Sequence, residues 1–362
     1  MGFPVSEMSR RAFLGCSAGA VLAHALPGFA LPRAGASGRI ILDTDPGVDD
    51  AMAIFLALRS PELQVEAITV VAGNVPLSLT LPNALRLVEI AGRPDIPVAA
   101  GASAPLVRRL VTAKYAHGNN GLGGVDFPEP KLKPVSESAV QLMSRLIHSS
   151  PGEISIVAVG PLTNVATALV SDPSLASKIR NIVVMGGSLT GGNITPAAEF
   201  NFYVDPEAAR IVFDSGVPLT MVGLNVTNRV QIHDEQIRVL EARQTPVSQA
   251  AGKIMRATLD RWQKERQLSG FGMHDPVTVA QVIDPTILTL KDYYVQIETT
   301  GELTAGESLV YSRAPRSSAP LATALPPAEA PDAEFKANCK VAVEADSERF
   351  FRLLLSRLTA AS

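Results

Sequence analysis

The feature that most constrains this chain is a dense run of aspartates directly after a short apolar stretch. Ile40-Ile41-Leu42 is followed, within eight positions, by Asp43, Asp45, Asp49 and Asp50. The apolar stretch is typical of a buried parallel strand, and residues 49–58 are typical of a helix with acids in its first turn. The carboxylates are therefore expected at the carboxyl end of a first strand, where open α/β sheets bind ligands.

Four carboxylates at one point repel each other, so they are costly unless a cation neutralises their charge. The sequence therefore predicts a metal site, and a purely oxygen-based set of ligands favours a hard cation. An acidic turn is the simpler alternative, because Pro46-Gly47 favours a loop and aspartate caps helices. That alternative accounts for one or two of the aspartates. It does not account for Asp43 and Asp45, which precede the turn.

Further along the chain, apolar strand-like runs alternate with helical patterns. The runs end at small or polar residues, such as Gly73-Asn74, Gly160-Pro161, Gly186-Gly187 and Gly223. This alternation predicts an α/β fold with a mostly parallel open sheet and helices on both faces. Residues 230–270 are polar with a helical pattern, and we expect a helical lobe or lid there. Residues 312–332 carry five prolines among alanines and serines, a composition typical of an extended surface excursion.

The first 36 residues have the pattern of a targeting segment. Ser9-Arg10-Arg11-Ala12-Phe13-Leu14 is a twin-arginine signal, an apolar stretch follows, and patterns for cleavage end at both Ala30 and Ala36. We therefore expect a signal peptide over 1–36, a folded domain over 37–362, and export by the twin-arginine machinery to the periplasm or beyond. No later apolar run is long enough to span a bilayer, so we expect no stable membrane association.

Composition narrows the choice of partners. The chain has 362 residues, of which 46% are apolar and 19% charged, and its formal net charge is −3. This is enough apolar material for a large globular core. Because no basic run occurs outside the N-terminus, the sequence gives no reason to expect a nucleic-acid partner.

Several polar motifs in the rest of the chain each have an ordinary explanation when taken singly. Glu199 and Asn201 could be loop or cap residues, His117 lies in a glycine-rich turn, and Asp275 could cap the helix that begins at Pro276. Together the motifs resemble the inosine–uridine-preferring nucleoside hydrolase family. In family order over residues 39–311, they are Asp43 to Asp50, Gly73-Asn74, His117-Gly118, Gly160 to Asn164, Met185 to Gly187, Glu199 to Asn201, Asp205 to Ala209, and His274 to Pro276.

The resemblance implies an enzyme that hydrolyses the N-glycosidic bond of ribonucleosides to ribose and free base. It also implies a Ca²⁺ cofactor held by Asp45, Asp50, the backbone carbonyl of Thr163, and Asp275. The nucleoside would contact Asp49, Asn74, His117, Met185, Asn193, Glu199 and Asn201. Asp43 would support the site, and the protein is expected to be a homo-oligomer, with dimer and tetramer both open.

The chemistry of this reaction suggests roles for individual side chains. A water held by Ca²⁺ is only mildly acidified, so a carboxylate must take its proton, and Asp45 fits that role. A histidine ordinarily titrates near neutrality and can therefore serve the departing base as an acid; His274 is the candidate, and His117 is a second candidate. Asn225 and Asn228 stand where many relatives carry Asp and His, so the preference for purine or pyrimidine bases stays open.

Two other functions remain as alternatives. Asp43-Thr44-Asp45 also resembles the nucleophile and acid of haloacid-dehalogenase-like phosphatases. That motif has Thr or Val where Gly47 stands, and it would leave Asp49 and Asp50 unexplained. The second alternative is an exported nucleoside-binding protein without catalysis. Binding alone needs no general base, so Asp45 and His274 argue against it.

Overall fold

The computed structural model describes residues 38–312 and 336–361. The signal peptide predicted over 1–36 and nearly all of the proline-rich segment lie outside these residues. The strands are β1 (Gly38–Thr44), β2 (Leu63–Val70), β3 (Val98–Ala100), β4 (Ile154–Ala158), β5 (Asn181–Met185), β6 (Leu219–Val222), β7 (Gln231–His233), β8 (Gly270–Gly272), β9 (Leu288–Ile297), β10 (Ser308–Tyr311) and β11 (Cys339–Ala345).

The helices lie mostly in the connections between these strands. They are α1 (Val48–Arg59), α2 (Leu77–Ile90), α3 (Lys114–His117), α4 (Ala139–Ser149), α5 (Thr163–Ser171), α6 (Phe200–Val204), α7 (Pro206–Phe213), α8 (Leu224–Thr227), α9 (Asp234–Glu241), α10 (Pro246–Arg266), α11 (His274–Ile283) and α12 (Ser347–Leu358), with a 3₁₀ turn over Pro173–Ser177. None of the helices within the described residues is long and apolar enough to cross a bilayer.

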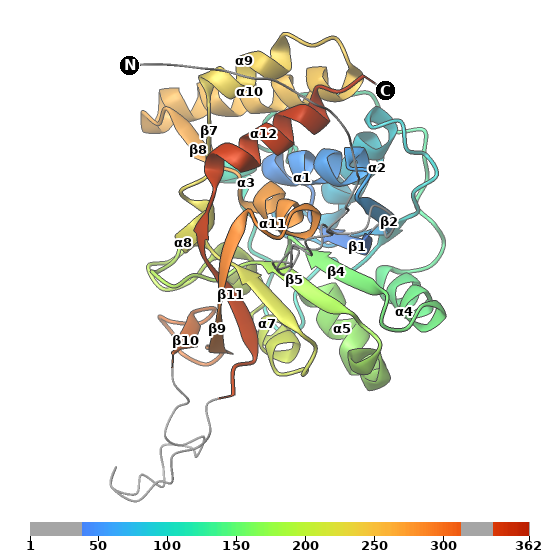
Figure 1. The fold of residues 1–362 in the computed structure, drawn as a ribbon, viewed down its shortest axis with the longest axis vertical. Coiled ribbons are helices and arrows are strands. Elements are labelled where there is room, and N and C mark those ends of the chain that lie inside the picture. Colours follow the sequence, from blue (N-terminus) through green and yellow to red (C-terminus); the bar gives the residue numbers. More distant parts are fainter. Residues whose placement is uncertain (1–37, 313–335, 362) are drawn as a thin grey trace, which may run out of the picture. The chain divides into compact units, whose positions relative to one another are not determined.

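Nine strands form one sheet in the order β10-β9-β11-β6-β5-β4-β1-β2-β3 (Figure 1). The strands from β11 to β3 run parallel, whereas β9 and β10 add an antiparallel edge. Helices cover both faces: α4, α5 and α7 lie on one side in Figure 1, and α1, α2, α11 and α12 lie on the other. The predicted α/β fold with a mostly parallel open sheet is confirmed.

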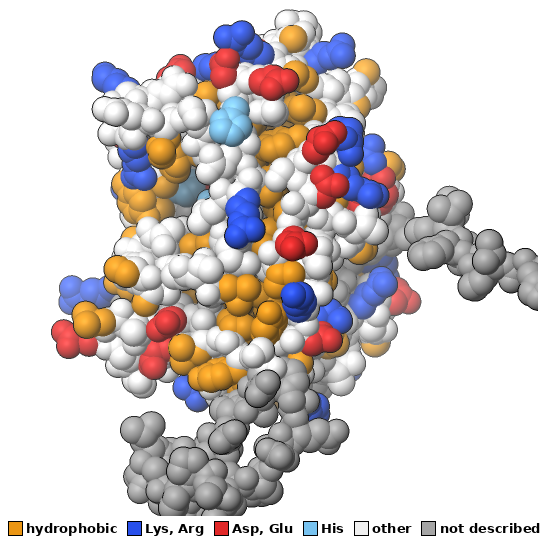
Figure 2. All heavy atoms as spheres, turned by 60° about the vertical axis from the view of Figure 1, so that its left-hand side comes forward, with side chains coloured by type: hydrophobic (Ala, Val, Ile, Leu, Met, Phe, Trp, Pro, Cys, Tyr) orange, Lys and Arg blue, Asp and Glu red, His pale blue; other side chains and the backbone are white. Residues whose placement is uncertain are grey.

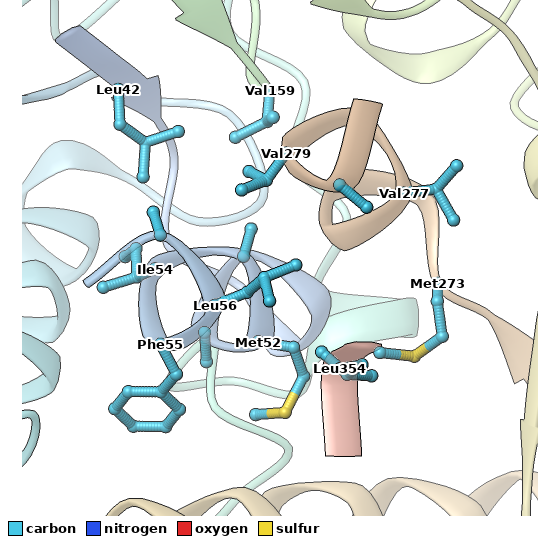
Figure 3. Close-up of a cluster of buried hydrophobic side chains, with 14 of the residues drawn as sticks. Leu42, Met52, Ile54, Phe55, Leu56, Val159, Met273, Val277, Val279 and Leu354 are labelled. Carbon is cyan, nitrogen blue, oxygen red and sulfur yellow. The ribbon is translucent and has the colours of Figure 1, made fainter. Parts of the chain in front are cut away.

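The apolar run in β1 is continuous because both faces of the sheet are covered. Leu42 packs into the core under α1 and α11, whereas its neighbour Ile41 packs into the core on the side of α5 and α7. Figure 3 shows the first of these cores, which contains Leu42 together with side chains from α1, α11 and α12. Phe55 of α1 is fully buried there. This packing fixes the start of α1, and thus the aspartates at that point, relative to the sheet.

The order of the strands places a crevice beside β1. From β1 the chain moves outward through β2 and β3, and then returns to the other side of β1 to form β4, β5 and β6. The strand order therefore reverses between β1 and β4, and α/β sheets of this kind bind ligands at the carboxyl ends of such strands. Asp45 follows the end of β1, and Val159 follows the end of β4.

Residues 230–270 contain α9 and α10, with the short strands β7 and β8 before and after them. The two strands pair in antiparallel fashion, so the segment begins and ends at the same point. Arg256 of α10 joins the two helices, because its guanidinium lies 2.7 Å from Asp234 and 2.9 Å from Glu241. The C-terminal end of α10 lies near the carboxyl ends of the parallel strands, where its side chains form part of the cavity described next.

Candidate active site

A cavity of about 310 Å³ lies at the carboxyl ends of β1, β4 and β5. Its wall combines carboxylates, amides and histidines with a group of aromatic side chains. The residues with carboxylate, amide or imidazole side chains are Asp49, Asn74, His117, Asn193, Glu199, Asn201, Asn228, Gln231, His274 and Asp275. A cavity with a few convergent polar groups and an apolar remainder is the usual form of a small-molecule site.

Three buried carboxylates lie together at one end of the cavity. Asp49, Asp50 and Asp275 each offer an oxygen, and these oxygens lie within 4.8 Å of one another. Asp49 and Asp50 come from the first turn of α1, and Asp275 comes from the first turn of α11. Burial raises the pKa of Asp49 and of Asp50 to about 6, and burial together with the neighbouring aspartates raises the pKa of Asp275. Without a cation, this arrangement opposes full ionisation.

Asp50 is held by hydrogen bonds on both of its oxygens. Its Oδ1 accepts from the Thr44 hydroxyl at 2.6 Å, and its Oδ2 accepts from the Gly47 N–H at 2.9 Å. The side-chain amide of Asn74 also donates to Oδ2, at 2.8 Å. The carboxylate therefore has one orientation, as a preorganised ligand needs.

Asp45 lies beside this cluster with one oxygen left unpaired. Its Oδ2 accepts from the backbone N–H of Asn74 at 2.6 Å, whereas its buried Oδ1 has no hydrogen-bond partner among the described residues. Burial and the charge of Asp50 raise its pKa well above the usual range. A Cβ at Gly73 would lie only 2.1 Å from Oδ2, and one at Gly160 would lie 2.5 Å from Oδ1. The carboxylate thus occupies space that is present only because residues 73 and 160 are glycines.

These observations fit a hard cation. The candidate ligand atoms are all oxygens, and the carboxylates are buried. The buried Oδ1 of Asp45 accepts no hydrogen bond from the described residues, so a bound cation would supply the partner that it needs. Asp43 lies behind the cluster and does not line the cavity. Its Oδ1 accepts from Thr69 at 2.6 Å and from Asn164 at 2.9 Å, and burial raises its pKa to about 7.

The amides and Glu199 occupy a second part of the cavity wall. Glu199 is buried and accepts from the backbone N–H groups of Gly187, Asn201 and Phe202, yet burial still raises its pKa to about 7. The Asn201 amide donates to the carbonyl of Met185, and Asn193 accepts from the N–H of Phe200. Met185 and all of the predicted substrate-binding residues line this one cavity.

Thr163 does not take the place predicted for it. Its hydroxyl donates to Asp205 at 2.6 Å, its carbonyl accepts from the Thr167 hydroxyl at 2.6 Å within α5, and it does not line the cavity. Val159, which directly follows β4, lines the cavity instead, and its carbonyl accepts from the Asn201 amide at 3.0 Å. The expectation for Thr163 is therefore corrected: at the β4–α5 turn, Val159 is the residue beside the site.

Both candidate histidines are neutral at pH 7. Burial lowers the pKa of His274 to about 4, and burial together with His274 and Arg261 lowers the pKa of His117 to about 3. The Nδ1 of His117 accepts from the Val48 N–H at 3.0 Å, so the ring proton of the neutral form lies on Nε2. The Nδ1 of His274 lies 2.7 Å from the Thr227 hydroxyl. The expectation of a histidine that titrates near neutrality does not hold in this environment.

The remaining wall is formed by residues that the sequence analysis did not assign to the site. Tyr115 of α3 lies there with Trp262 and Arg266 of α10, together with Phe271 of β8. Only a weak signal could have indicated them: Tyr115 stands two residues before His117, and Trp262 is the only tryptophan of the chain, within the predicted lid.

The fold and the cavity together define an α/β enzyme with an acidic site at the carboxyl ends of parallel strands. Residues 40–352 match the family profile described as inosine-uridine preferring nucleoside hydrolase, and the chain belongs to this family. The predicted family is thus confirmed.

Individual relatives agree with this assignment. The chain is 44% identical over 324 residues to a pyrimidine-specific ribonucleoside hydrolase RihA of Salmonella gallinarum, with 88% of this chain and 97% of the relative covered. Among solved structures, it is similar to a plant nucleoside hydrolase, the PpNRh1 enzyme, with a TM-score of 0.79, 36% identity, and 90% and 100% of the two chains covered. It is also similar to a purine-preferring ribonucleoside hydrolase from Gardnerella vaginalis, with a TM-score of 0.79, 30% identity, and 89% and 98% covered.

Proposed function

We propose that this nucleoside hydrolase uses Ca²⁺, takes Asp45 as its general base and prefers pyrimidine ribonucleosides. The general reaction, hydrolysis of a ribonucleoside to ribose and free base, follows from membership of the family. The observation that carries the finer proposal is the buried cluster of Asp49, Asp50 and Asp275 beside the unpaired Oδ1 of Asp45. The two alternative functions, a phosphatase and a binding protein without catalysis, do not require this arrangement of carboxylates.

The proposed cation is held by Asp45, Asp50 and Asp275, with the carbonyl of Val159 as the backbone ligand in place of Thr163. Oxygen ligands of this kind suit Ca²⁺, which accepts six to eight of them in flexible geometry. When bound, Ca²⁺ supplies positive charge that holds a water and sugar hydroxyls and keeps the aspartates ionised. Support comes from the burial of the carboxylates and their raised pKa values.

The side chains of the cavity then have separate tasks. Asp45, whose Oδ1 is free of other partners, accepts the proton of the attacking water. Asp49, with the amides of Asn74 and Asn201, holds the ribose hydroxyls and so fixes the sugar. The buried carboxylates favour the positive charge that develops on the sugar as the glycosidic bond breaks. Neutral His274 donates a hydrogen bond to the departing base, and His117 is the second candidate for this task.

The preference for pyrimidines is proposed from the relatives. The Salmonella gallinarum relative, at 44% identity, is named pyrimidine-specific, whereas the purine-preferring structure is only 30% identical. Export by the twin-arginine machinery, with a periplasmic or secreted location, is proposed from the pattern at Arg10-Arg11. A homo-oligomer is likewise proposed, from the family resemblance.

The experiment is a comparison of kcat/KM for uridine, cytidine, inosine, adenosine and guanosine, with ribose release as the readout. We expect uridine and cytidine to exceed the purine nucleosides by at least about tenfold. A preference for inosine or guanosine would contradict the pyrimidine proposal. Release of phosphate from a phosphate ester, with no ribose from any nucleoside, would support the phosphatase alternative.

A further inference from the structure

The cavity wall contains one cation that the mechanism above does not use. Arg266 is the only lysine or arginine among the cavity-lining residues that the structure describes. No carboxylate of the described residues lies within 4.0 Å of its guanidinium, and no described residue accepts a hydrogen bond from it, although many other arginines of the chain are paired. Its N–H donors are therefore available to a ligand.

Two aromatic rings lie next to the guanidinium of Arg266. Its Cζ lies 5.1 Å from the centroid of the Trp262 ring and 5.7 Å from that of the Tyr115 ring. These are cation–π distances, and such contacts hold a guanidinium without using up its N–H donors. Arg266 is also the last residue of α10, because Gln267 has a φ of 57° and ends the helix.

A second contact joins the same two segments. The guanidinium of Arg261, one turn before the end of α10, donates to the carbonyl of Ala116 in α3. Thus α3, which carries Tyr115 and His117, and the end of α10 are linked by both a hydrogen bond and the Tyr115–Arg266 stack. Arg266 itself is exposed to solvent at the rim of the cavity, where its contacts with the Trp262 and Tyr115 rings favour a position beside the bound base.

The reaction creates a need for positive charge at the base. When the bond between C1′ and N1 of a pyrimidine nucleoside breaks, both electrons go to the base. The negative charge then spreads from N1 to the carbonyl oxygens, which stand at C2 and C4 in uracil and at C2 in cytosine. The proton that the attacking water loses passes to Asp45, and the base takes up its own proton from solvent after release, so that nucleoside and water give ribose and base.

We propose that Arg266 is a further catalytic residue, whose guanidinium donates hydrogen bonds to a carbonyl oxygen of the pyrimidine as the base leaves. The inference rests on the proposed function, and it adds a second leaving-group contact, from a cation, to the hydrogen bond proposed for neutral His274. A planar guanidinium with paired donors suits a carbonyl oxygen that gains negative charge. Such a contact strengthens in the transition state and therefore acts on kcat more than on KM.

The test compares two substrates that differ in their need for leaving-group stabilisation. Uridine expels a basic pyrimidine anion, whereas 4-nitrophenyl riboside expels a phenolate that is stable without help. We expect Arg266→Met to lower kcat for uridine by about 100-fold, the usual effect of losing one donor to a developing oxyanion. For 4-nitrophenyl riboside, we expect a change of less than about threefold, because its leaving group needs no such donor.

Two further variants make the result specific. Arg266→Lys keeps the charge but loses the planar donors, so its kcat for uridine should fall between those of the wild type and of Arg266→Met. Lys264→Met removes an exposed charge from the same helix without altering the cavity wall, and both substrates should be hydrolysed at wild-type rates.

Two outcomes for Arg266→Met would overturn the inference. An equal loss with both substrates would show that Arg266 only supports the shape of the cavity, and no loss with uridine would show that it does not contact the base. Failure of the proposed pyrimidine preference looks different, because the wild-type protein would then hydrolyse inosine or guanosine better than uridine.

Discussion

Removal of the metal should destabilise this protein much more at pH 7 than at pH 4. Most proteins gain stability as the pH rises from 4 to 7, because paired carboxylates ionise more readily in the folded state. Here burial raises the folded-state pKa of Asp49 and Asp50 to about 6, from an ordinary value of 3.8. Between these pH values the two aspartates bind more protons in the folded state than in the unfolded state, so their contribution to the free energy of unfolding falls as the pH rises.

The size of the effect follows from these pKa values. A difference of one in pKa corresponds to about 1.4 kcal/mol, so the raised pKa values of Asp49 and Asp50 together cost several kcal/mol, on the order of 3 or more, above pH 6. Asp45 and Asp275 are shifted in the same direction and add to this loss. The total cost of ionising these carboxylates is a large part of the free energy of unfolding of a typical domain, which is about 5–15 kcal/mol. Bound Ca²⁺ favours the ionised carboxylates and removes the loss.

The assay is denaturant unfolding of chelator-treated protein between pH 4 and pH 7, with and without added Ca²⁺. His117 and His274, whose pKa values burial lowers, gain stability over the same range in both forms, so the quantity to compare is the difference between the Ca²⁺-loaded and the metal-free protein. This difference should grow by several kcal/mol from pH 4 to pH 7. Asp50→Asn should flatten the pH dependence, whereas Asp126→Asn, at an exposed position, should leave it unchanged. A stabilisation by Ca²⁺ that is the same at pH 4 and at pH 7 would refute the reasoning.

Three further substitutions have defined outcomes. Asp45→Asn should lower kcat for uridine at least about 100-fold in a folded protein, because it removes the base but keeps the shape; circular dichroism checks the fold, and near-wild-type turnover would argue against Asp45 as the base. His274→Ala should reduce the hydrolysis of uridine much more than that of 4-nitrophenyl riboside, and an equal small loss with both would exclude a leaving-group role. Gly73→Ala should weaken Ca²⁺ binding in calorimetry, since the added Cβ would lie 2.1 Å from Asp45 Oδ2, and unchanged affinity would contradict the tight fit around that carboxylate.

The position of the acidic site could be predicted because its signals are local. The apolar run before Asp43 is continuous, as a strand covered on both faces requires, and the aspartates after it begin a helix. Parallel strands share one carboxyl edge, so motifs at several strand ends could be expected to meet. The structure brings Asp49, Asn74, Glu199 and Asn201 to one cavity in agreement with this reasoning.

Other features depend on contacts that a local sequence does not encode. The start of α2 was not predictable from pattern, because the helix begins at Leu77 and contains Pro82, a residue that usually ends a helix. The choice between Val159 and Thr163 depends on which carbonyl of one turn faces the cavity, and this orientation is set by the packing of α5.

The aromatic part of the wall was missed for a similar reason. Tyr115 and Arg266 lie about 150 positions apart in the chain, and only the packing of α3 against the end of α10 brings them together. Likewise, the sequence alone gave the histidines an ordinary pKa, because it does not show that His117 and His274 are buried.

The most direct test of the account is ribose release from uridine by chelator-treated protein before and after Ca²⁺ is added, in the wild type and in Asp50→Asn. We predict that chelation abolishes release, that Ca²⁺ restores it fully in the wild type, and that Asp50→Asn needs a much higher Ca²⁺ concentration. Full activity in the chelator-treated protein, or equal Ca²⁺ requirements in the two proteins, would contradict a calcium site built on these aspartates.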